Sequence, residues 1–587
     1  MTETAPTTRG GEWLVADTDP AKMMTRERIT DEHRLIEQTA REFMDGEVLP
    51  VLDRLEQKEW ALNRILLQKC GALGLLGTNV PDTYGGVDLD KVATLIVSER
   101  LAVNASFAAT FGAQANLTIL PIFMFGTEAQ KAKYLPGLVA GDVAGAYCLS
   151  ETGSGSDALG ARAKATRQAD GSFVLSGEKM WITNGGFADV FIVFAKVDGQ
   201  QFTAFIVERA WPGVSSGQEE HKMGLHGSST TPVLLQDVKV PADAVLGEIG
   251  KGHKVAFNVL NFGRFKLGAM TSGGAKDALA DAAKYAASRK QFGVAIATFG
   301  AIKHKLGEMT AREYALESLM YRTAGLVDET VAANGGSPAA VLAALEEYAV
   351  EASIAKVYGS EVVDYVIDES VQILGGNGFV ADYPVERRYR DARVNRIFEG
   401  TNEINRLLIP GMLIKKSVRG DLPLMKAAKV IQDELMAPPA MPASDDLPLA
   451  DERRGVAAFK KVALFVAGAA MQRFGDALEH EQEVLSSLAD IVIDAYAAES
   501  AVLRALAAAS GPEAALHAAT ATVVAHEAAG RIELAARAAL AALGEGDTLR
   551  THLAALRRLL KLTPANLVTR RRLIADAAVA RGGYPFA

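Results

Sequence analysis

The sequence has only two cysteines, Cys70 and Cys148, among 587 residues. Two cysteines cannot form the disulfide framework of a small secreted scaffold, and they fit a reducing compartment. The cysteines and nine histidines form no cluster with metal-ligand spacing, so we expect no bound metal. An excess of basic residues is also missing. The net charge of -9 and the pI of about 5.7 argue against nucleic-acid binding through a basic face.

Long hydrophobic runs are missing as well. The most apolar run of the C-terminal half, residues 462–471, is flanked by Lys461 and Arg473. It is far shorter than the ~20 residues that a transmembrane helix needs. Residues 1–17 have neither the apolar core of a secretory signal nor the Arg-rich amphipathic pattern of a transit peptide. We therefore expect a cytoplasmic protein that is soluble or at most peripheral to a membrane.

The composition that is present is that of a globular protein, with 49% hydrophobic and 23% charged residues. The length predicts roughly three to four domains. The pattern of elements predicts a mainly α-helical protein with an inserted β domain. The expected divisions are an N-terminal tail at residues 1–24, a helical domain at 25–144, a β domain at 145–249, a second helical domain at 250–415, a linker or mobile segment at 416–453 and a C-terminal helical bundle at 454–587.

Periodicity and turn signals support these divisions. Apolar residues recur at helical spacing within residues 62–76 and 95–119. Short β-branched or aromatic runs follow at residues 173–177, 190–194, 202–207 and 233–238, separated by turn signals. Helical patterns return from residue 251 to about 413. A Pro-rich, acidic stretch at residues 437–451 then precedes a long Ala/Leu-rich helical region.

The most informative segment is RIFEGTNEI at residues 396–404. It places Glu399 after an apolar pair and before a helix start, with Thr401 or Asn402 as the N-cap. A poorly solvated carboxylate has a raised pKa and is a stronger base once ionised. The alternative is that Glu399 only flanks a helix N-terminus, where negative charge is favourable.

Glycine-rich segments offer further candidates. Residues 153–158, GSGSDA, match a dinucleotide-binding fingerprint, but an alternating strand pattern follows where that fingerprint requires a helix. Residues 181–186, WITNGG, are either a strand end with a packed Trp181 or the lining of a flat aromatic ligand. Residues 372–378, QILGGNG, end a helix in more glycines than a C-cap requires, and so indicate close backbone approach to a ligand.

Two arginines have unusual sequence surroundings. Arg264 lies within a largely apolar helix, where a cation without a partner is rare, so a buried anion or ligand is expected nearby. Arg289 is part of RKQFG at residues 289–293, which is either a solvated basic helix end or a contact to anionic phosphates.

Taken together and in this order, these motifs resemble those of the acyl-CoA dehydrogenase family. The resemblance covers roughly residues 28–414, and the combination is highly specific although each piece alone is weak. The segment NFGRF at residues 261–265 and the helical extension after residue 437 are similar to the very-long-chain branch of the family. The matching segments are YCLSE at 147–151, GSD at 155–157, GEKMWITNG at 177–185, RKQFG at 289–293, QILGGNG at 372–378 and IFEGTN at 397–402.

This resemblance implies a helical domain, a β-barrel-like domain and a helical bundle that together hold FAD, followed by the C-terminal extension. It implies α,β-dehydrogenation of an acyl-CoA, with long-chain substrates favoured, to trans-2-enoyl-CoA in fatty-acid β-oxidation. Glu399 is then the base that removes the α proton while hydride passes to the flavin. An electron-transfer flavoprotein is the implied electron acceptor, and a homodimer is the implied assembly.

The resemblance also assigns binding residues. Those implied to contact the FAD of their own subunit are Tyr147, Leu149, Ser150, Ser156, Trp181, Ile182, Thr183, Thr401 and Glu403. Those implied to reach the FAD of the neighbouring subunit are Arg289, Gln291, Gln372, Gly375 and Gly376. Those implied to contact the acyl-CoA are Ser156, Asn261, Arg264 and Gly400.

The sequence departs from the family pattern at several positions. Ser150 replaces the commoner Thr, Thr152 replaces the usual Pro, and Gly300 stands where many members have a polar residue that contacts FAD across subunits. Residues 105–113 are implied to line the floor of the acyl pocket. Small residues there favour a deep channel, whereas Phe107 and Phe111 favour a shorter one.

Other interpretations stay open from the sequence. The nearest enzymatic alternative is an acyl-CoA oxidase or another flavin-dependent activity of the superfamily, and a non-catalytic assembly protein that retains the fold is a third. An amphipathic segment around Lys426, Lys429, Val430, Ile431 and Leu435 is either a weak peripheral membrane contact or a surface helix, and we favour the surface helix.

Overall fold

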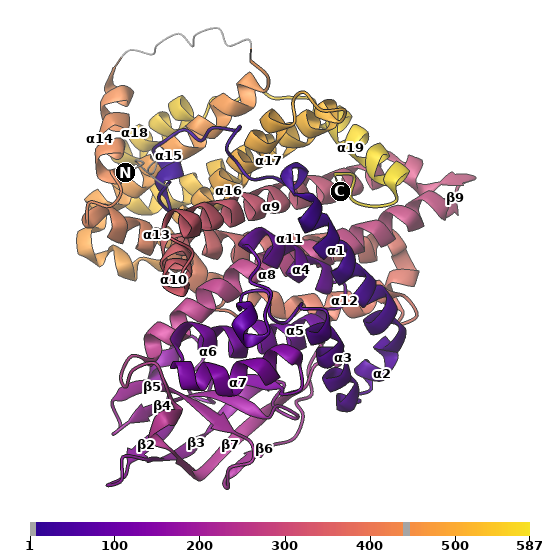
Figure 1. Ribbon diagram of the computed structural model, residues 1–587. Helices are drawn as coiled ribbons and strands as arrows, with labels where there is room; N and C mark the ends of the chain where they lie inside the picture. The colour runs from indigo at the N-terminus through magenta and orange to yellow at the C-terminus, as the bar shows by residue number, and fades with distance from the viewer. Residues whose placement is uncertain (1–7, 438–446, 587) are drawn as a thin grey trace.

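The computed structural model describes residues 8–437 and 447–586, in which helices surround one end of a single large sheet (Figure 1). The N-terminal helical domain begins at α1, where Thr30 forms a capping box with His33. Its helices bury Phe43, Leu67 and Phe107 in a core shared with the β domain. The α-helices are α1 Asp31–Phe43, α2 Leu52–Glu56, α3 Trp60–Ala72, α4 Lys91–Leu101, α5 Ala105–Gln114, α6 Leu120–Phe125 and α7 Glu128–Ala140.

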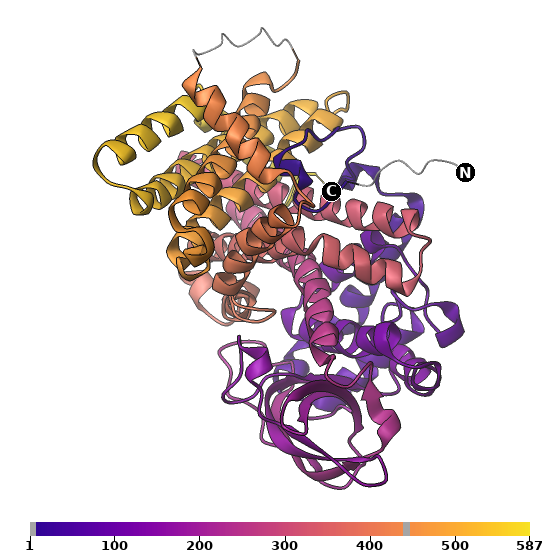
Figure 2. The ribbon, with the colours of Figure 1, turned by 90° about the vertical axis from the view of Figure 1, so that its left-hand side faces the viewer.

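The β domain is one eight-stranded sheet, which curls strongly at the bottom of Figure 2. The strand order is β6-β7-β3-β2-β4-β5-β8, and β1 adds to β4 in parallel. The long β3–β7 pair changes register between Lys179 and Ile182, next to the chain reversal that follows Thr183. The strands are β1 Gly145–Cys148, β2 Lys164–Arg167, β3 Phe173–Thr183, β4 Val190–Val197, β5 Gln201–Glu208, β6 Val214–Ser216, β7 Thr230–Val240 and β8 Val245–Leu246.

The second helical domain is built around α8, a helix of 37 residues, which packs along α9 and α11. A small hairpin of β9 Lys290–Gln291 and β10 Val294–Ala295 joins α8 to α9 and projects from the right-hand side of Figure 1. The helices are α8 Gly252–Ser288, α9 Gly300–Ala333, α10 Pro338–Glu347, α11 Ala349–Leu374, α12 Pro384–Ala392 and α13 Asn402–Val418.

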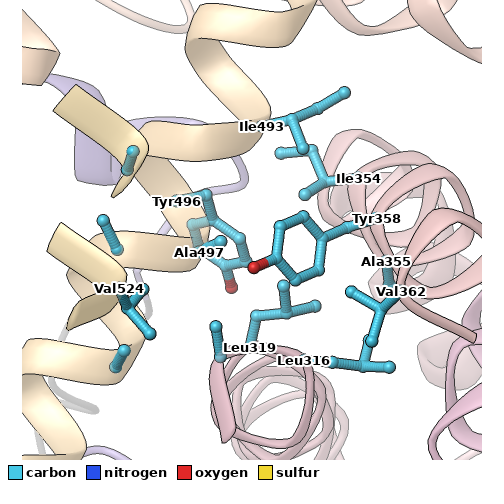
Figure 3. Packing of buried hydrophobic residues seen from close by; sticks show 14 of the residues in the cluster. Leu316, Leu319, Ile354, Ala355, Tyr358, Val362, Ile493, Tyr496, Ala497 and Val524 are labelled. Carbon is cyan, nitrogen blue, oxygen red and sulfur yellow. The ribbon is translucent and has the colours of Figure 1, made fainter. Parts of the chain in front are cut away.

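The C-terminal extension is a helical bundle that packs directly on this second domain. Figure 3 shows Tyr358 of α11 pointing toward Tyr496 of α16, with Leu316 and Leu319 of α9 beneath them. The N-terminal segment also joins this contact, since Trp13 stacks on Tyr496 at 4.8 Å. The helices are α14 Leu424–Met436, α15 Ala450–Phe474, α16 Gln482–Ala507, α17 Ala514–Leu543, α18 Gly546–Leu559 and α19 Leu567–Arg581.

The mainly helical architecture with an inserted β domain and a C-terminal helical extension is confirmed. The interval expected to be a linker or mobile segment is partly different. Residues 424–436 form α14, which packs Ala428 and Ile431 against the bundle, because its apolar residues recur at helical spacing. The rest of the predicted Pro-rich stretch includes residues 438–446, which lie outside the described residues.

Two helical stretches are long and apolar enough to cross a membrane, Ala105–Phe125 and Ala450–His480. Their most apolar windows are 78% and 61% buried within the protein. Core helices of soluble proteins share this composition, so these stretches are weak evidence for a membrane span.

A buried ionic network holds the extension to the second helical domain. Arg504 of α16 has no exposed surface and pairs with Glu317 of α9 and Glu27, each at 2.6 Å. Tyr584, after α19, donates to Glu317 at 2.8 Å, and Lys276 of α8 also pairs with Glu317. Burial alone raises the pKa of a carboxyl, but these cations keep the pKa of Glu317 far below its usual value.

We predict that Arg504→Ala strongly destabilises the protein, by about 3–5 kcal/mol, because it leaves buried carboxylates without their cation. Thermal melting followed by circular dichroism checks this. Arg550→Ala is the control, since it removes an exposed Arg–Asp pair on α18. It should leave the melting temperature unchanged. Equal melting temperatures for the two variants would contradict the prediction.

Candidate functional site

Glu399 lies in a tight turn directly before α13. Of the two N-cap candidates, Thr401 and Asn402, the structure selects Thr401, whose hydroxyl accepts from the Ile404 backbone N–H at 3.3 Å. Glu399 and Gly400 both have left-handed backbones, with φ of 57° and 80°. A non-glycine residue in this region costs about 1–3 kcal/mol and persists only where the surroundings enforce it. The turn therefore imposes one direction on the Glu399 side chain.

That side chain points at the surface of α8. A Cβ atom placed on Gly263 would lie 2.6 Å from Oε2 of Glu399, so only glycine leaves room for the carboxylate there. Oε2 is buried and has no hydrogen-bond partner among the described residues. A buried carboxylate oxygen without a donor is rare in native proteins, and it marks a site that a ligand completes.

Burial raises the pKa of Glu399 to about 7, and the positive charges of Arg264 and Lys356 limit this rise. The carboxyl therefore titrates near neutral pH, which suits an acid or base in catalysis. The buried hydroxyl of Tyr147 also lacks a partner, and Glu399 adds to the effect of burial in raising its pKa. Glu399 thus lies between α8 and strand β1 of the β domain.

Arg264 is held by uncharged groups. Its Nε donates to the backbone oxygen of Glu399 at 3.1 Å, and its Nη1 donates to Oδ1 of Asn261 at 3.0 Å. Because the side chain is only 7% exposed, burial lowers its pKa. Both contacts help to fix the turn at Glu399. Since no carboxylate of the described residues forms an ion pair with Arg264, its positive charge remains close to Glu399.

The β-domain candidates lie on β1, on β3 and in the segment that follows β1. Trp181 has a left-handed backbone, with φ of 59°, and 58% of it is exposed, while Ile182 after it is buried. The Ser150 carbonyl accepts from Met180 at 3.0 Å and joins the two strands. Tyr147 and Leu149 belong to the same edge, Thr183 is half-buried at the end of β3, and Ser156 is exposed in the loop after β1.

Only the short 3-10 helix Ala158–Gly160 follows the GSGSDA segment, so the rejection of the dinucleotide fingerprint is confirmed.

A second group of candidates lies far from Glu399. Arg289 follows the last residue of α8, roughly 38 Å along the helix axis from Arg264. The residues of this group are exposed and line the β9–β10 hairpin and the end of α11: Arg289, Gln291, Gln372, Gly375 and Gly376. One compact site cannot contain both groups. Each chain therefore presents two partial sites, as expected if the second group completes a site on another subunit.

The glycines at the end of α11 have different physical causes. Gly375 has a left-handed φ of 61°, and a Cβ on Gly378 would lie 2.5 Å from the backbone oxygen of Val371. Gly376 meets neither constraint, because a Cβ there would contact nothing within 4 Å. Gly375 and Gly378 serve the turn, whereas Gly376 leaves its backbone open to a ligand or partner. At Gly300, the nearest group to such a Cβ is Nη2 of Arg572, at 3.6 Å, which brings a cation of α19 to this surface.

These groups fit a large, flat and anionic cofactor such as FAD. The fit rests on the unpartnered Tyr147 hydroxyl, the exposed Trp181 ring and the open backbone at Gly153 and Gly155, where a Cβ would touch nothing. Among the described residues, no group of three or more His, Cys, Asp or Glu side chains forms a metal site.

A narrow, mostly apolar cavity of about 60 Å³ begins beside Phe398, the residue before Glu399. Its walls come from α5, α8, α11, α12 and the 3-10 helix Arg393–Arg396. Small residues dominate the α5 side, in agreement with the predicted pocket floor, whereas Phe111 is buried in the core and does not line this cavity. The lining includes Ala105, Ala108, Ala109, Met270, Thr271, Gly274, Val363 and Ile367.

Sequence reasoning missed two residues of this site. Gly263 lies inside a helical pattern, and nothing in the sequence shows that a carboxylate lies against it. Lys356 interrupts an apolar stretch of α11 and has no exposed surface. The signal that selected Arg264, a cation within an apolar helix, was present at Lys356 as well.

Comparison with known proteins gives four matches to family models along the chain. Models described as acyl-CoA dehydrogenase N-terminal domain and middle domain match residues 30–142 and 146–238. Two models described as acyl-CoA dehydrogenase C-terminal domain match residues 250–412 and 458–558. The second of these lies within the C-terminal extension.

Individual relatives agree with these matches. The chain is 47% identical to a probable acyl-CoA dehydrogenase of Bacillus subtilis over 96% of both chains. It is also 38% identical to the human mitochondrial very long-chain specific acyl-CoA dehydrogenase, over 61% of this chain and 53% of that one. A crystal structure of an acyl-CoA dehydrogenase complexed with FAD from Bacillus anthracis has a TM-score of 0.96 at 47% identity, covering 98% of this chain and 100% of that one. Butyryl-CoA dehydrogenase from Megasphaera elsdenii has a TM-score of 0.61 at 39% identity, over 66% of this chain and 99% of that one.

We predict that Gly263→Ala moves the Glu399 carboxylate away from α8 and toward water, so that its pKa falls from about 7 toward the ordinary value. The carboxyl infrared band titrated with pH, assigned by its loss in Glu399→Gln, measures this. The fold should be kept, because alanine stabilises a helix interior by about 1 kcal/mol relative to glycine. Gly530→Ala on α17, where a Cβ meets nothing, is the control and should leave that band unchanged. An unchanged pKa in Gly263→Ala would show that the contact does not hold the carboxylate.

Proposed function

Because this chain belongs to the acyl-CoA dehydrogenase family of FAD-dependent oxidoreductases, we propose that it oxidises long-chain acyl-CoA to trans-2-enoyl-CoA in fatty-acid β-oxidation. The observation that carries this proposal is the buried Glu399 carboxylate, whose Oε2 has no hydrogen-bond partner among the described residues and whose neighbour Phe398 lines an apolar cavity. FAD, when bound, supplies the acceptor for the β hydride.

Glu399 is proposed as the base that takes the α proton. Its carboxylate must be ionised, so the rate of proton removal should increase as pH rises through about 7. The α proton of a thioester becomes acidic only if the carbonyl oxygen is stabilised as charge develops. The backbone N–H of Glu399 has no acceptor among the described residues, and it is suited to donate to that oxygen.

The remaining residues are proposed to bind and orient. Tyr147, Leu149, Ser150, Ser156, Trp181, Ile182, Thr183, Thr401 and Glu403 are proposed to contact the FAD of their own subunit. Arg264, Asn261, Gly400 and Ser156 are proposed to contact the acyl-CoA. Arg264 orders the turn through the Glu399 backbone oxygen, so it aligns the base as well as adding positive charge.

We propose a homodimer because the second group of candidates, on the β9–β10 hairpin and at the end of α11, needs a site on another subunit to act on. Large apolar side chains lie exposed around this group, notably Phe292 at 94%, Phe379 at 85% and Val380 at 42% exposure. Exposed apolar residues gathered around polar binding groups are typical of an interface. Arg289, Gln291, Gln372, Gly375 and Gly376 are proposed to reach the FAD of the partner subunit.

The chain-length preference rests on the cavity walls. Ala105, Ala108 and Ala109 leave space between α5 and α8, which supports a long acyl chain. Anaerobic titration of the flavin absorbance with acyl-CoAs of graded length tests this preference. Equal bleaching by butyryl-CoA and palmitoyl-CoA would contradict it.

An electron-transfer flavoprotein is proposed as the electron acceptor. The oxidase alternative is separated by measuring peroxide formation in air, and the non-catalytic alternative by a purified protein that is colourless and takes up no FAD.

We place the reaction in the cytoplasm. For α14 we keep the surface-helix interpretation, because Ile431 is buried against the bundle and Glu434 pairs with Lys461 of α15.

We predict that Glu399→Gln retains yellow flavin but is bleached by acyl-CoA at least about 10²–10⁴-fold more slowly, since an amide cannot accept the α proton. Stopped-flow absorbance under anaerobic conditions measures this rate. Glu479→Gln, which alters an exposed carboxylate of the C-terminal extension, is the control and should remain within tenfold of wild type. Bleaching of Glu399→Gln at the wild-type rate would refute the assignment of the base.

We predict that Phe379→Asp weakens both the dimer and FAD binding, because a charge at the apolar interface is costly to desolvate. Light scattering measures the mass, and flavin fluorescence measures release of FAD. Leu534→Asp on α17 changes a residue that is also 71% exposed, and should alter neither quantity. A Phe379→Asp protein that stays dimeric and holds FAD as tightly as wild type would rule out this interface.

A further inference from the structure

Lys356 is a buried cation that the proposed reaction does not use. It lies on α11 without exposed surface, and its Nζ donates to Oδ1 of Asn402 at 2.7 Å. Its charge also interacts with the Glu399 carboxylate. Burial of an ammonium group is costly, so a lysine kept at such a position needs a compensating interaction.

Asn402 transmits this contact to the turn. It is the first residue of α13, three residues after Glu399, and only 2% of it is exposed. Its Nδ2 donates to Oγ of Ser360 at 3.0 Å and to Oε1 of Glu361 at 3.1 Å. Lys356, Ser360 and Glu361 all belong to α11, so one asparagine side chain fastens the start of α13 to a single face of α11.

The same set of contacts continues into the C-terminal bundle. Glu361 pairs with Arg406 of α13 at 2.8 Å, and Arg406 pairs with Asp490 of α16 at 2.7 Å. These three residues line a cavity of about 470 Å³ between the second helical domain and the bundle. The turn at Glu399 is therefore connected to the extension by a continuous series of charged and amide groups.

We propose that Lys356 is a positioning residue for Glu399, which holds the left-handed turn through Asn402 and places a positive charge beside the carboxylate. The proposal rests on the function of Glu399 as the base. Lys356 does not touch the reacting atoms in this arrangement. It acts on the direction of the carboxylate and on the pH at which the carboxylate becomes ionised.

The charges around the pair define the expected effect. The groups that face Glu399 are Arg264 from α8, Lys356 from α11 and the Tyr147 hydroxyl from β1. The groups that face Lys356 are Glu399, Arg264, Glu403 and Glu361. Because Lys356 and Glu399 both titrate at about 7, they lose protons as a pair. Without Lys356, Arg264 alone opposes the effect of burial, and Glu399 keeps its proton to a higher pH.

The test is Lys356→Met, which keeps the length of the side chain and suits a buried position. The rate of flavin bleaching by acyl-CoA is measured anaerobically over a range of pH. This range covers the acid limb, the part of the profile in which the rate rises with pH to a plateau. We expect the midpoint of this limb to rise by about one pH unit, since a nearby opposite charge lowers a carboxyl pKa by 1–3 units. We expect the plateau rate to fall by about 10-fold or more as the base loses its alignment. FAD affinity, measured by flavin fluorescence, should match wild type.

Lys91→Met is the matched control. Lys91 on α4 is also buried, and its Nζ donates to Oδ1 of Asn79 at 2.8 Å, but its charge is not among those that face Glu399. It should leave the midpoint and the plateau unchanged. Lys356→Met with a wild-type midpoint and plateau would overturn the proposal. So would equal midpoint shifts in the two variants.

If Lys356→Met does not fold, Asp490→Asn tests the series of contacts between the turn at Glu399 and the C-terminal bundle, at the end that lies on α16. Loss of this carboxylate removes one of the two ion pairs that hold Arg406, and we expect a reduced plateau with unchanged FAD affinity. An unchanged plateau there would count against the proposal. Failure of the proposed function is distinguishable, because the wild-type protein would then not be bleached by any acyl-CoA.

Discussion

The structure depends on one carboxylate being kept away from water in a fixed direction. Glu399 has a backbone conformation that costs energy, and its side chain fits only because α8 has glycine at position 263. Among the described residues, its Oε2 has no hydrogen-bond donor, and the preceding residue, Phe398, lines an apolar cavity. Strain and desolvation are both unfavourable for folding, so the surrounding contacts must be strong enough to maintain them. Those contacts explain much of the remaining architecture.

The domains share the task of enclosing this site. The β domain brings Tyr147 close to Glu399, and α8 and α11 bring Arg264 and Lys356. Each cation has a neutral hydrogen-bond partner close to the turn, which fixes its place without neutralising Glu399 through a direct ion pair. The C-terminal bundle contacts α9 through the Arg504–Glu317 ion pair and α11 through the apolar contact around Tyr358 in Figure 3.

Much of the site was predictable because its signals are local. An N-cap at Thr401 or Asn402 follows from their polar side chains and the helical pattern after them, and the structure has the cap at Thr401. Rejection of the dinucleotide fingerprint needed only the alternating residues after it. Arg264 was recognisable as a cation in an apolar helix. The contacts of Gly263 and Lys356 join residues 136 and 46 positions apart along the chain, and no local pattern reports such contacts.

The sequence alone determined the order of helical and β segments, the family resemblance and the choice of Glu399, since periodicity, turn residues and short motifs are properties of neighbouring residues. Tertiary structure alone decided that the hairpin candidates lie far from Glu399, that α14 packs on the bundle, and that Lys356 lies beside the carboxylate. The physical reason is that burial, pKa and the absence of a hydrogen-bond partner depend on which distant segments meet. These properties come into existence only when the chain is folded.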